Sequence, residues 1–143
     1  FTVEGQTLEL RGRVDRLERD TDGSLVVVDL KTMAKPPTAK AVQGNLQLAT
    51  YRALVERDDE LPGTVGAAEL VQLRAGATGD ASAPKVQRQE ATEELSAELD
   101  DALAQAVRTI AAGAFRATPG AACGYCPFTA SCPAQPSGQA VVP

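Results

Sequence analysis

A short and almost uninterrupted apolar run places the strongest constraint on how this chain folds. Residues 25–30 read Leu-Val-Val-Val-Asp-Leu, and Lys31 follows them. A run of this length and composition predicts a strand that is buried on both faces. A charge in such a strand is costly unless it is paired or binds an ion. Asp29 and Lys31 therefore either leave the core where the strand ends or have a function there.

The residues before this run predict its partner strand. Apolar residues recur at even spacing between Thr7 and Leu17 and alternate with charged ones, which is the periodicity of a strand. Residues 20–24 read Asp-Thr-Asp-Gly-Ser, a turn signal. We therefore expect a hairpin, in which a three-residue loop with Gly23 in the left-handed conformation pairs Asp20 with Ser24.

The register of this hairpin decides where the acidic residues lie. Counting back along both strands from the three-residue loop places Asp15 opposite Asp29, at a Cβ separation of about 4.5–5.5 Å. Two carboxylates at that distance repel each other unless a cation lies between them. A two-residue loop would instead pair Asp15 with Leu30, so both registers remain open at this stage.

The rest of the chain predicts an α/β fold. Helical periodicity covers 39–57 and 92–112, the second helix beginning at Thr92 and ending at Gly113, and strands are expected over 64–73 and 86–89. Proline, glycine and cysteine dominate after residue 118. We predict a small mixed sheet flanked by helices in a core of residues 1–117, followed by a cysteine-rich loop and tail over 118–143.

Composition narrows the class of protein. The chain has 143 residues, 43% of them hydrophobic, which suits one domain with a core. Its net charge of -5 argues against a basic nucleic-acid clamp, but it is compatible with a nuclease whose acidic site uses metal ions. Histidine is absent, which excludes catalysis or metal ligation by histidine within these residues.

The same sequence gives an expectation about location. It contains no apolar run long enough to span a membrane, and nothing at its start resembles a signal peptide. We therefore expect a soluble, cytoplasmic protein. Because the chain opens on Phe1 rather than methionine, we also interpret it as a segment of a longer protein.

The two charges at the end of the apolar run suggest a chemistry. Residues two apart on a strand share a face, so Asp29 and Lys31 point the same way, and Asp15 joins them in the first register. Carboxylates bind Mg²⁺, and a neighbouring lysine can orient water or offset charge on a phosphorane-like transition state, as phosphodiester hydrolysis requires. The alternative is a surface ion pair of Asp29 with Lys31, with Asp15 paired to Arg13 or Arg16.

The cysteines form a second cluster of interest. Cys123, Cys126 and Cys132 follow the spacing Cys-x2-Cys-x5-Cys, and they are the only cysteines of the chain. An odd, clustered number without a secretory signal indicates a reducing compartment and metal rather than disulfides. The spacing suits Zn²⁺ or an iron-sulfur cluster. A reduced tail or adventitious zinc is the alternative.

Four segments together carry a family resemblance. They read GRVDRLE at 12–18, VVVDLKT at 26–32, QLATY at 47–51 and CGYCPFTASC at 123–132. In this order they resemble the PD-(D/E)xK nuclease domain of the RecB family, the type fused to or partnered with DNA-repair helicases in the AddAB and AdnAB lineages. The resemblance implies a restriction-endonuclease-like core.

The resemblance also implies roles for individual residues. Asp15 and Asp29 would hold Mg²⁺ or Mn²⁺, with the Leu30 carbonyl as a further ligand, and Lys31 would be the catalytic lysine. Gln47 and Tyr51 match the Gln-x-x-x-Tyr motif of the family, and their spacing of four places them on one helical face. The ordinary alternative is that Tyr51 packs in the core and Gln47 is solvated.

Two residues of the family pattern have no counterpart here. The resemblance implies a [4Fe-4S] cluster on Cys123, Cys126 and Cys132, with a fourth cysteine upstream of the nuclease motifs, and a metal-ligating histidine upstream of the first strand. This sequence contains neither residue. Truncation explains both, whereas a subfamily with a reduced site is the alternative.

The function implied is a Mg²⁺- or Mn²⁺-dependent deoxyribonuclease, with exonuclease activity expected, that hydrolyses single-stranded DNA within a helicase-nuclease of DNA repair and recombination. Its partners would be DNA and helicase domains of the same chain or of a partner subunit. Two alternatives remain: a non-catalytic, nuclease-like module that threads DNA or braces a helicase, and a zinc-dependent interaction domain centred on the cysteines.

Overall fold

The structure is a computed structural model that describes residues 1–3, 5–61, 63–136 and 138. The chain divides into two compact units, Phe1–Gln105 and Ala106–Pro143. The functional division between 1–117 and 118–143 remains a prediction, and the end of the predicted tail, at 137 and 139–143, lies outside the described residues. Pro62 also lies outside the described residues; together with Leu61 and Gly63 it predicts the end of the helix expected over 39–57.

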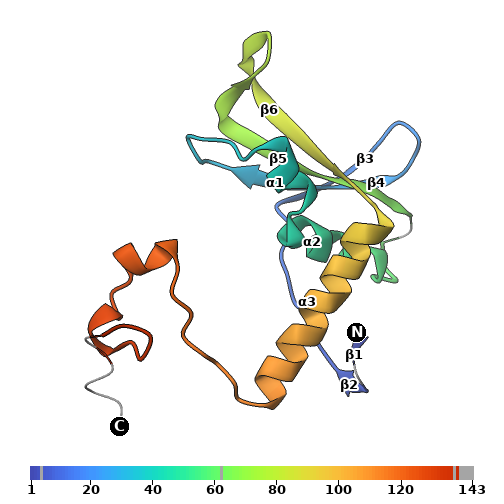
Figure 1. The fold of residues 1–143 in the computed structure, drawn as a ribbon. Coiled ribbons are helices and arrows are strands. Elements are labelled where there is room, and N and C mark those ends of the chain that lie inside the picture. The colour runs from blue at the N-terminus through green and yellow to red at the C-terminus, as the bar shows by residue number, and fades with distance from the viewer. Residues whose placement is uncertain (4, 62, 137, 139–143) are drawn as a thin grey trace. The chain divides into compact units, whose positions relative to one another are not determined.

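A four-stranded mixed sheet forms the centre of the first unit, in the order β3-β4-β5-β6 (Figure 1). Its strands are β3 (Arg16–Arg19), β4 (Leu25–Lys31), β5 (Val65–Ala77) and β6 (Asp80–Glu90). The outer pairs β3/β4 and β5/β6 are antiparallel, while β4 and β5 run parallel. The mixed α/β class predicted from the sequence is therefore confirmed.

The predicted register of the first hairpin is confirmed. Asp20 N–H donates to the Ser24 carbonyl over 2.8 Å, and Gly23 has a φ of 89°, the left-handed conformation that the loop requires. The ladder continues to the pair Arg16 and Val28. One further step in the same register places Asp15 opposite Asp29.

The strand expected from Thr7 to Leu17 is wrong over most of its length. Only Arg16–Arg19 joins the sheet, while Gln6–Thr7 (β2) pairs with Thr2–Val3 (β1) in a separate small hairpin. Leu8 and Leu10, which carried the alternation, pack against the cluster formed by Ala49, Ala53, Leu95, Leu99 and Leu103. Their burial comes from contact with helices, so an even spacing of apolar residues did not indicate a strand.

The single helix expected over 39–57 is also wrong, because it is broken into α1 (Ala39–Gln43) and α2 (Leu46–Glu56). Gly44 ends the first helix. The side chain of Asn45 begins the second, since its Oδ1 accepts from Gln47 N–H at 2.9 Å and Leu48 N–H at 3.2 Å. The break lets α1 pack on β6 while α2 packs on β4 and β5.

The main core lies between these helices and one face of the sheet. Val42 of α1 and Leu48 of α2 pack with Val27 of β4 and Leu70 of β5. A polar side chain holds the helical junction to this face: Gln89 of β6 is fully buried, and its Nε2 donates to the carbonyls of Val42, Gln43 and Asn45 at 2.8, 3.0 and 3.0 Å. The position of α2 therefore depends on the sheet as well as on its own cap.

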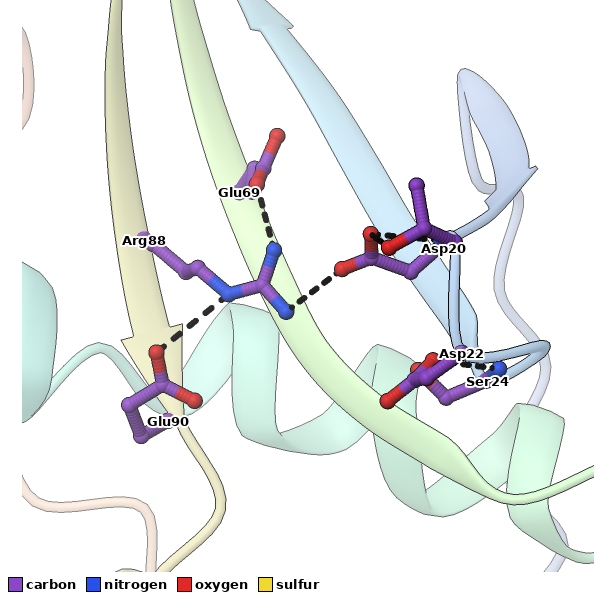
Figure 2. Close-up of polar contacts among 7 residues, drawn as sticks. Asp20, Asp22, Ser24, Glu69, Arg88 and Glu90 are labelled. Atoms are coloured by element: carbon purple, nitrogen blue, oxygen red, sulfur yellow. Dashed lines mark hydrogen bonds and ion pairs between the residues drawn. The ribbon is translucent and has the colours of Figure 1, made fainter.

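On the opposite face of the sheet, Arg88 lies at the centre of a cluster of charged side chains (Figure 2). Its guanidinium contacts Glu69 of β5 at 3.1 Å, Glu90 of its own strand at 3.3 Å, and Asp20 in the β3–β4 turn at 3.0 Å. Arg88 thereby ties the edge strand β6 to the first hairpin. Hydrogen bonds from the Thr21 backbone and from Arg88 lower the pKa of Asp20.

The second hairpin and the long helix match the sequence expectations more closely. β5 and β6 were expected and are longer than predicted, since pairing with β4 ends at Gln72 but the hairpin continues beyond it. Helix α3 runs from Glu93 to Ala111; the Thr92 hydroxyl accepts from Leu95 N–H at 3.1 Å, and Gly113 follows the helix with a φ of 58°.

In the second unit, the cysteine region forms two short 3₁₀ helices, Ala121–Tyr125 and Thr129–Ser131. None of the helices in the described part of the chain combines the length and apolar character needed to cross a membrane.

Candidate functional site

The end of β4 carries a buried acid and a lysine in contact. Asp29 is 5% exposed because it shares the helix-covered face with Val27. The Nζ of Lys31 lies 2.6 Å from Asp29 Oδ2, and it donates a hydrogen bond to Gln47 Oε1 at 3.2 Å. The charges of the apolar run thus neutralise each other at the edge of the core, with the lysine side chain 25% exposed.

Asp15 is held at the same place by the backbone of β4. It directly precedes β3, and its Oδ2 accepts from Leu30 N–H at 2.9 Å. In the antiparallel pattern this N–H would bond a residue of the partner strand, so the Asp15 carboxylate extends the ladder past the end of β3. The alternative in which Asp15 pairs with Arg16 does not describe this geometry, because Arg16 pairs with Glu18.

Gln47 and Tyr51 extend this group along one face of α2. Gln47 Nε2 and Tyr51 OH are 3.1 Å apart, which leaves Gln47 Oε1 free to accept from Lys31. The Asn45 cap fixes the backbone of Gln47. Gly12 leaves room for the tyrosine ring, since a Cβ at this glycine would lie 3.3 Å from Tyr51 Cε1 and 3.1 Å from Leu54 Cδ1.

The structure therefore joins four of the predicted residues in one chain of contacts, from Asp29 through Lys31 and Gln47 to Tyr51. Asp15 reaches the same strand end through Leu30. These residues come from three segments that are distant in sequence. Parts of the ordinary alternatives are also present, because Asp29 and Lys31 form an ion pair and Tyr51 packs against the core. The functional roles of these residues therefore remain predictions.

The donor set suits a hard cation. Asp29 Oδ2 is buried and accepts no hydrogen bond among the described residues, because the approach of Lys31 is that of an ion pair without hydrogen-bond geometry. A second carboxylate and the Leu30 carbonyl belong to the same strand end, and such oxygens are ligands of Mg²⁺ and Mn²⁺. Among the described residues, however, no three acidic, histidine or cysteine side chains gather as a metal-binding group. Water or substrate oxygens would have to complete the coordination.

The cysteines are not assembled in the same way. Cys123, Cys126 and Cys132 are half-buried free thiols in and beside the two 3₁₀ helices, and Cys123 Sγ accepts from Gly120 N–H at 3.3 Å. The described part of the chain does not bring the three sulfurs together as a ligand set. The iron-sulfur cluster therefore remains a prediction.

Two features of the site were not found from the sequence. Asn45 fixes the start of α2, and its signal was the Gly-Asn pair at 44–45, which is typical of a helix end followed by a cap. The other is Gln72 of β5, a fully buried side chain beside Lys31 in the sheet register. It lies in a strand that pattern analysis predicts as apolar, and only the pairing of β4 with β5 reveals its position.

Comparison with known proteins agrees with this geometry. No curated protein matches the chain. The sequence model of one protein family, the PD-(D/E)XK nuclease superfamily, matches residues 1–133. This range contains the β4 end, the helix with Gln47 and Tyr51, and the cysteines. With a mixed sheet that carries an Asp-x-Lys strand end, the chain belongs to the PD-(D/E)XK nuclease superfamily.

Proposed function

We propose that this chain is the nuclease domain of a RecB-type helicase-nuclease, and that it hydrolyses single-stranded DNA with Mg²⁺ or Mn²⁺ in cytoplasmic DNA repair and recombination. Membership of the superfamily gives a nuclease-type function. The four ordered motifs support the finer assignment, including exonuclease activity and a helicase partner in the same chain or another subunit.

One observation carries the proposal: the contact chain from Asp29 to Tyr51 at the end of β4. A buried carboxylate costs free energy, and a single surface ion pair would not require it to be buried. Here a helix that packs on the sheet supplies a glutamine to the lysine, and the lysine faces the acid. A site that positions a phosphodiester beside a cation needs an arrangement of this kind.

Each residue has a distinct task in this proposal. A bound divalent cation would polarise the scissile phosphate and lower the pKa of a coordinated water. Asp29 and Asp15, with the Leu30 carbonyl, would provide the oxygens that hold it. Lys31 keeps a positive charge beside the reacting phosphate and is oriented by Gln47. Tyr51 fixes the amide of Gln47 through its hydroxyl group.

A second candidate is a nuclease-like module without catalysis. It is favoured by the observation that the described residues supply two carboxylates at the strand end rather than three. In this case the Lys31 ammonium would remain the only counter-ion of Asp29 and no metal would bind.

One experiment distinguishes the two candidate functions. Single-stranded DNA cleavage in Mn²⁺ is measured for the full chain and for Asp29→Ala, with Arg74→Ala as the matched control because Arg74 lies on β5, beyond its pairing with β4. We expect the Asp29 variant to lose cleavage while its circular dichroism spectrum is retained, and the control to keep cleavage. Retained cleavage in Asp29→Ala, or none in the parent, contradicts the proposal.

A further inference from the structure

Gln72 is an exception among the buried polar side chains of the sheet. Its exposed fraction is 0%, and neither its Oε1 nor its Nε2 has a hydrogen-bond partner among the described residues. Most buried polar groups in proteins are hydrogen-bonded, to protein or to ordered water. An unpaired group costs about 1–3 kcal/mol. An apolar residue here would give a more stable core, so the glutamine calls for an explanation.

The sheet register gives Gln72 a specific neighbour. Gln72 pairs with Lys31 across the parallel β4/β5 ladder and with Lys85 across the antiparallel β5/β6 ladder. Paired residues on adjacent strands point to the same face, about 4.8 Å apart. Gln72 therefore lies next to Lys31 in the sheet, on the face that also carries Asp29, and half-buried Lys85 is its neighbour on the other side.

Other glutamines of this face have evident structural tasks, and Gln72 has none. Gln89 Nε2 donates to three carbonyls of the α1–α2 junction, and Gln87 Nε2 donates to the Pro37 carbonyl at 2.9 Å. Both therefore anchor the backbone that covers the sheet. Gln72 anchors no backbone group, so its amide remains available to the side chain next to it.

Lys31 has a hydrogen-bonding position to offer. An ammonium group has three N–H donors: one donates to Gln47 Oε1, a second side faces Asp29 Oδ2 in an ion pair, and one direction remains for a further partner. No direct hydrogen bond joins Lys31 to Gln72. A bridging water would accept from Lys31 Nζ and donate to Gln72 Oε1, as buried waters do between polar groups that do not meet directly.

We propose that Gln72 is a positioning residue for Lys31: its amide holds a buried water that fixes the third direction of the ammonium group. The catalytic part of this proposal rests on the proposed nuclease function, in which Lys31 is held toward the reacting phosphate. The structural part does not depend on that function, because NMR can show directly whether the Lys31 ammonium group is held in one position.

The first test separates stability from activity. In Gln72→Leu an apolar side chain replaces the amide and the water that it holds, so we expect the melting temperature to be nearly unchanged, whereas kcat for single-stranded DNA should fall about 10- to 100-fold with little change in KM. The matched control is Gln87→Leu, which loses a formed hydrogen bond and should melt lower but cleave normally. Gln72→Met, with an unbranched side chain of similar length, replaces the leucine variant if that one does not fold.

The second test is independent of cleavage. The ¹⁵Nζ–¹H signal of Lys31, identified by its loss in Lys31→Met, should be visible in the wild type because its exchange with solvent is slowed, and it should broaden in Gln72→Leu. An unchanged or absent Lys31 signal overturns the proposal, as does wild-type kcat in Gln72→Leu. Broadening of Lys85 instead of Lys31 also overturns it. If the wild type does not cleave DNA, the nuclease function fails and the signal still decides the role of Gln72.

Discussion

Gln89 offers a quantitative test of how the sheet positions the helix that carries Gln47 and Tyr51. Its amide nitrogen lies within 3.0 Å of three carbonyl oxygens at the junction of α1 and α2. The substitution Gln89→Glu keeps the size of the side chain but replaces the donor with an oxygen that faces acceptors. A carboxylate there would be buried without a partner, so the new carboxyl group must take up a proton in the folded state.

The loss of folding stability can be calculated from the cost of this protonation. Holding a carboxyl group of ordinary pKa near 4.3 in its neutral form at pH 7 costs about 3.7 kcal/mol, at 1.36 kcal/mol per pH unit. The neutral group has one O–H donor where the amide has two N–H donors, which removes about 1 kcal/mol more. We therefore expect Gln89→Glu to lower the free energy of unfolding by about 4–5 kcal/mol at pH 7.

The pH dependence gives the decisive signature. The pKa of the introduced group is raised in the folded state, so stability is lost as the pH rises above its unfolded value. At pH 5 the protonation cost falls to about 1 kcal/mol, and the variant should recover most of its deficit. Urea denaturation at pH 5 and pH 7 measures both values. A deficit below 1 kcal/mol at pH 7, or one that does not change with pH, would refute the reasoning.

Three further outcomes are expected. Gly12→Ala places a Cβ 3.3 Å from the Tyr51 ring and should lower both stability, by about 1 kcal/mol, and DNA cleavage, whereas Gly124→Ala, where a Cβ meets nothing within 4 Å, should change neither. Asn45→Ala removes the cap of α2 and should cost about 1 kcal/mol in urea denaturation; no loss would contradict the capping role. Because the pKa of Asp20 is lowered in the folded state, its ionised carboxylate stabilises the fold at pH values above the ordinary pKa of 3.8, and this stabilisation is lost as the pH falls below that value. The stabilities of the wild type and of Asp20→Asn should therefore converge toward pH 2. A difference in stability that stays constant with pH would exclude this linkage.

Local chemistry explains which parts of the fold could be predicted. The β3–β4 turn depends on Gly23, whose left-handed conformation suits the three-residue loop, and of the two registers that the sequence allows this loop selects the one with Asp15 opposite Asp29. The start of α3 depended in the same way on the Thr92 hydroxyl group. Each of these signals acts within a few residues, so the sequence contains all of the information needed.

The failures arose where distant segments decide the structure. Leu8 and Leu10 alternate like strand residues, but helices α2 and α3 bury them and no strand forms there. The break at Gly44 depends partly on Gln89, which donates to the junction from a strand more than forty residues away. Gln72 could not be placed at the site because its neighbour Lys31 is defined by a parallel pairing, which no local pattern encodes.

We propose that the carboxylates at the end of β4 form a metal site, and Mn²⁺ binding to this site can be measured by calorimetry without any cleavage assay. The chain and its Asp29→Ala variant are titrated under identical conditions, with Asp80→Ala as a control that removes an exposed acid at the start of β6. We expect saturable Mn²⁺ binding to the chain and to the control, and none to the Asp29 variant. Equal binding by all three proteins, or no binding to any of them, would contradict it.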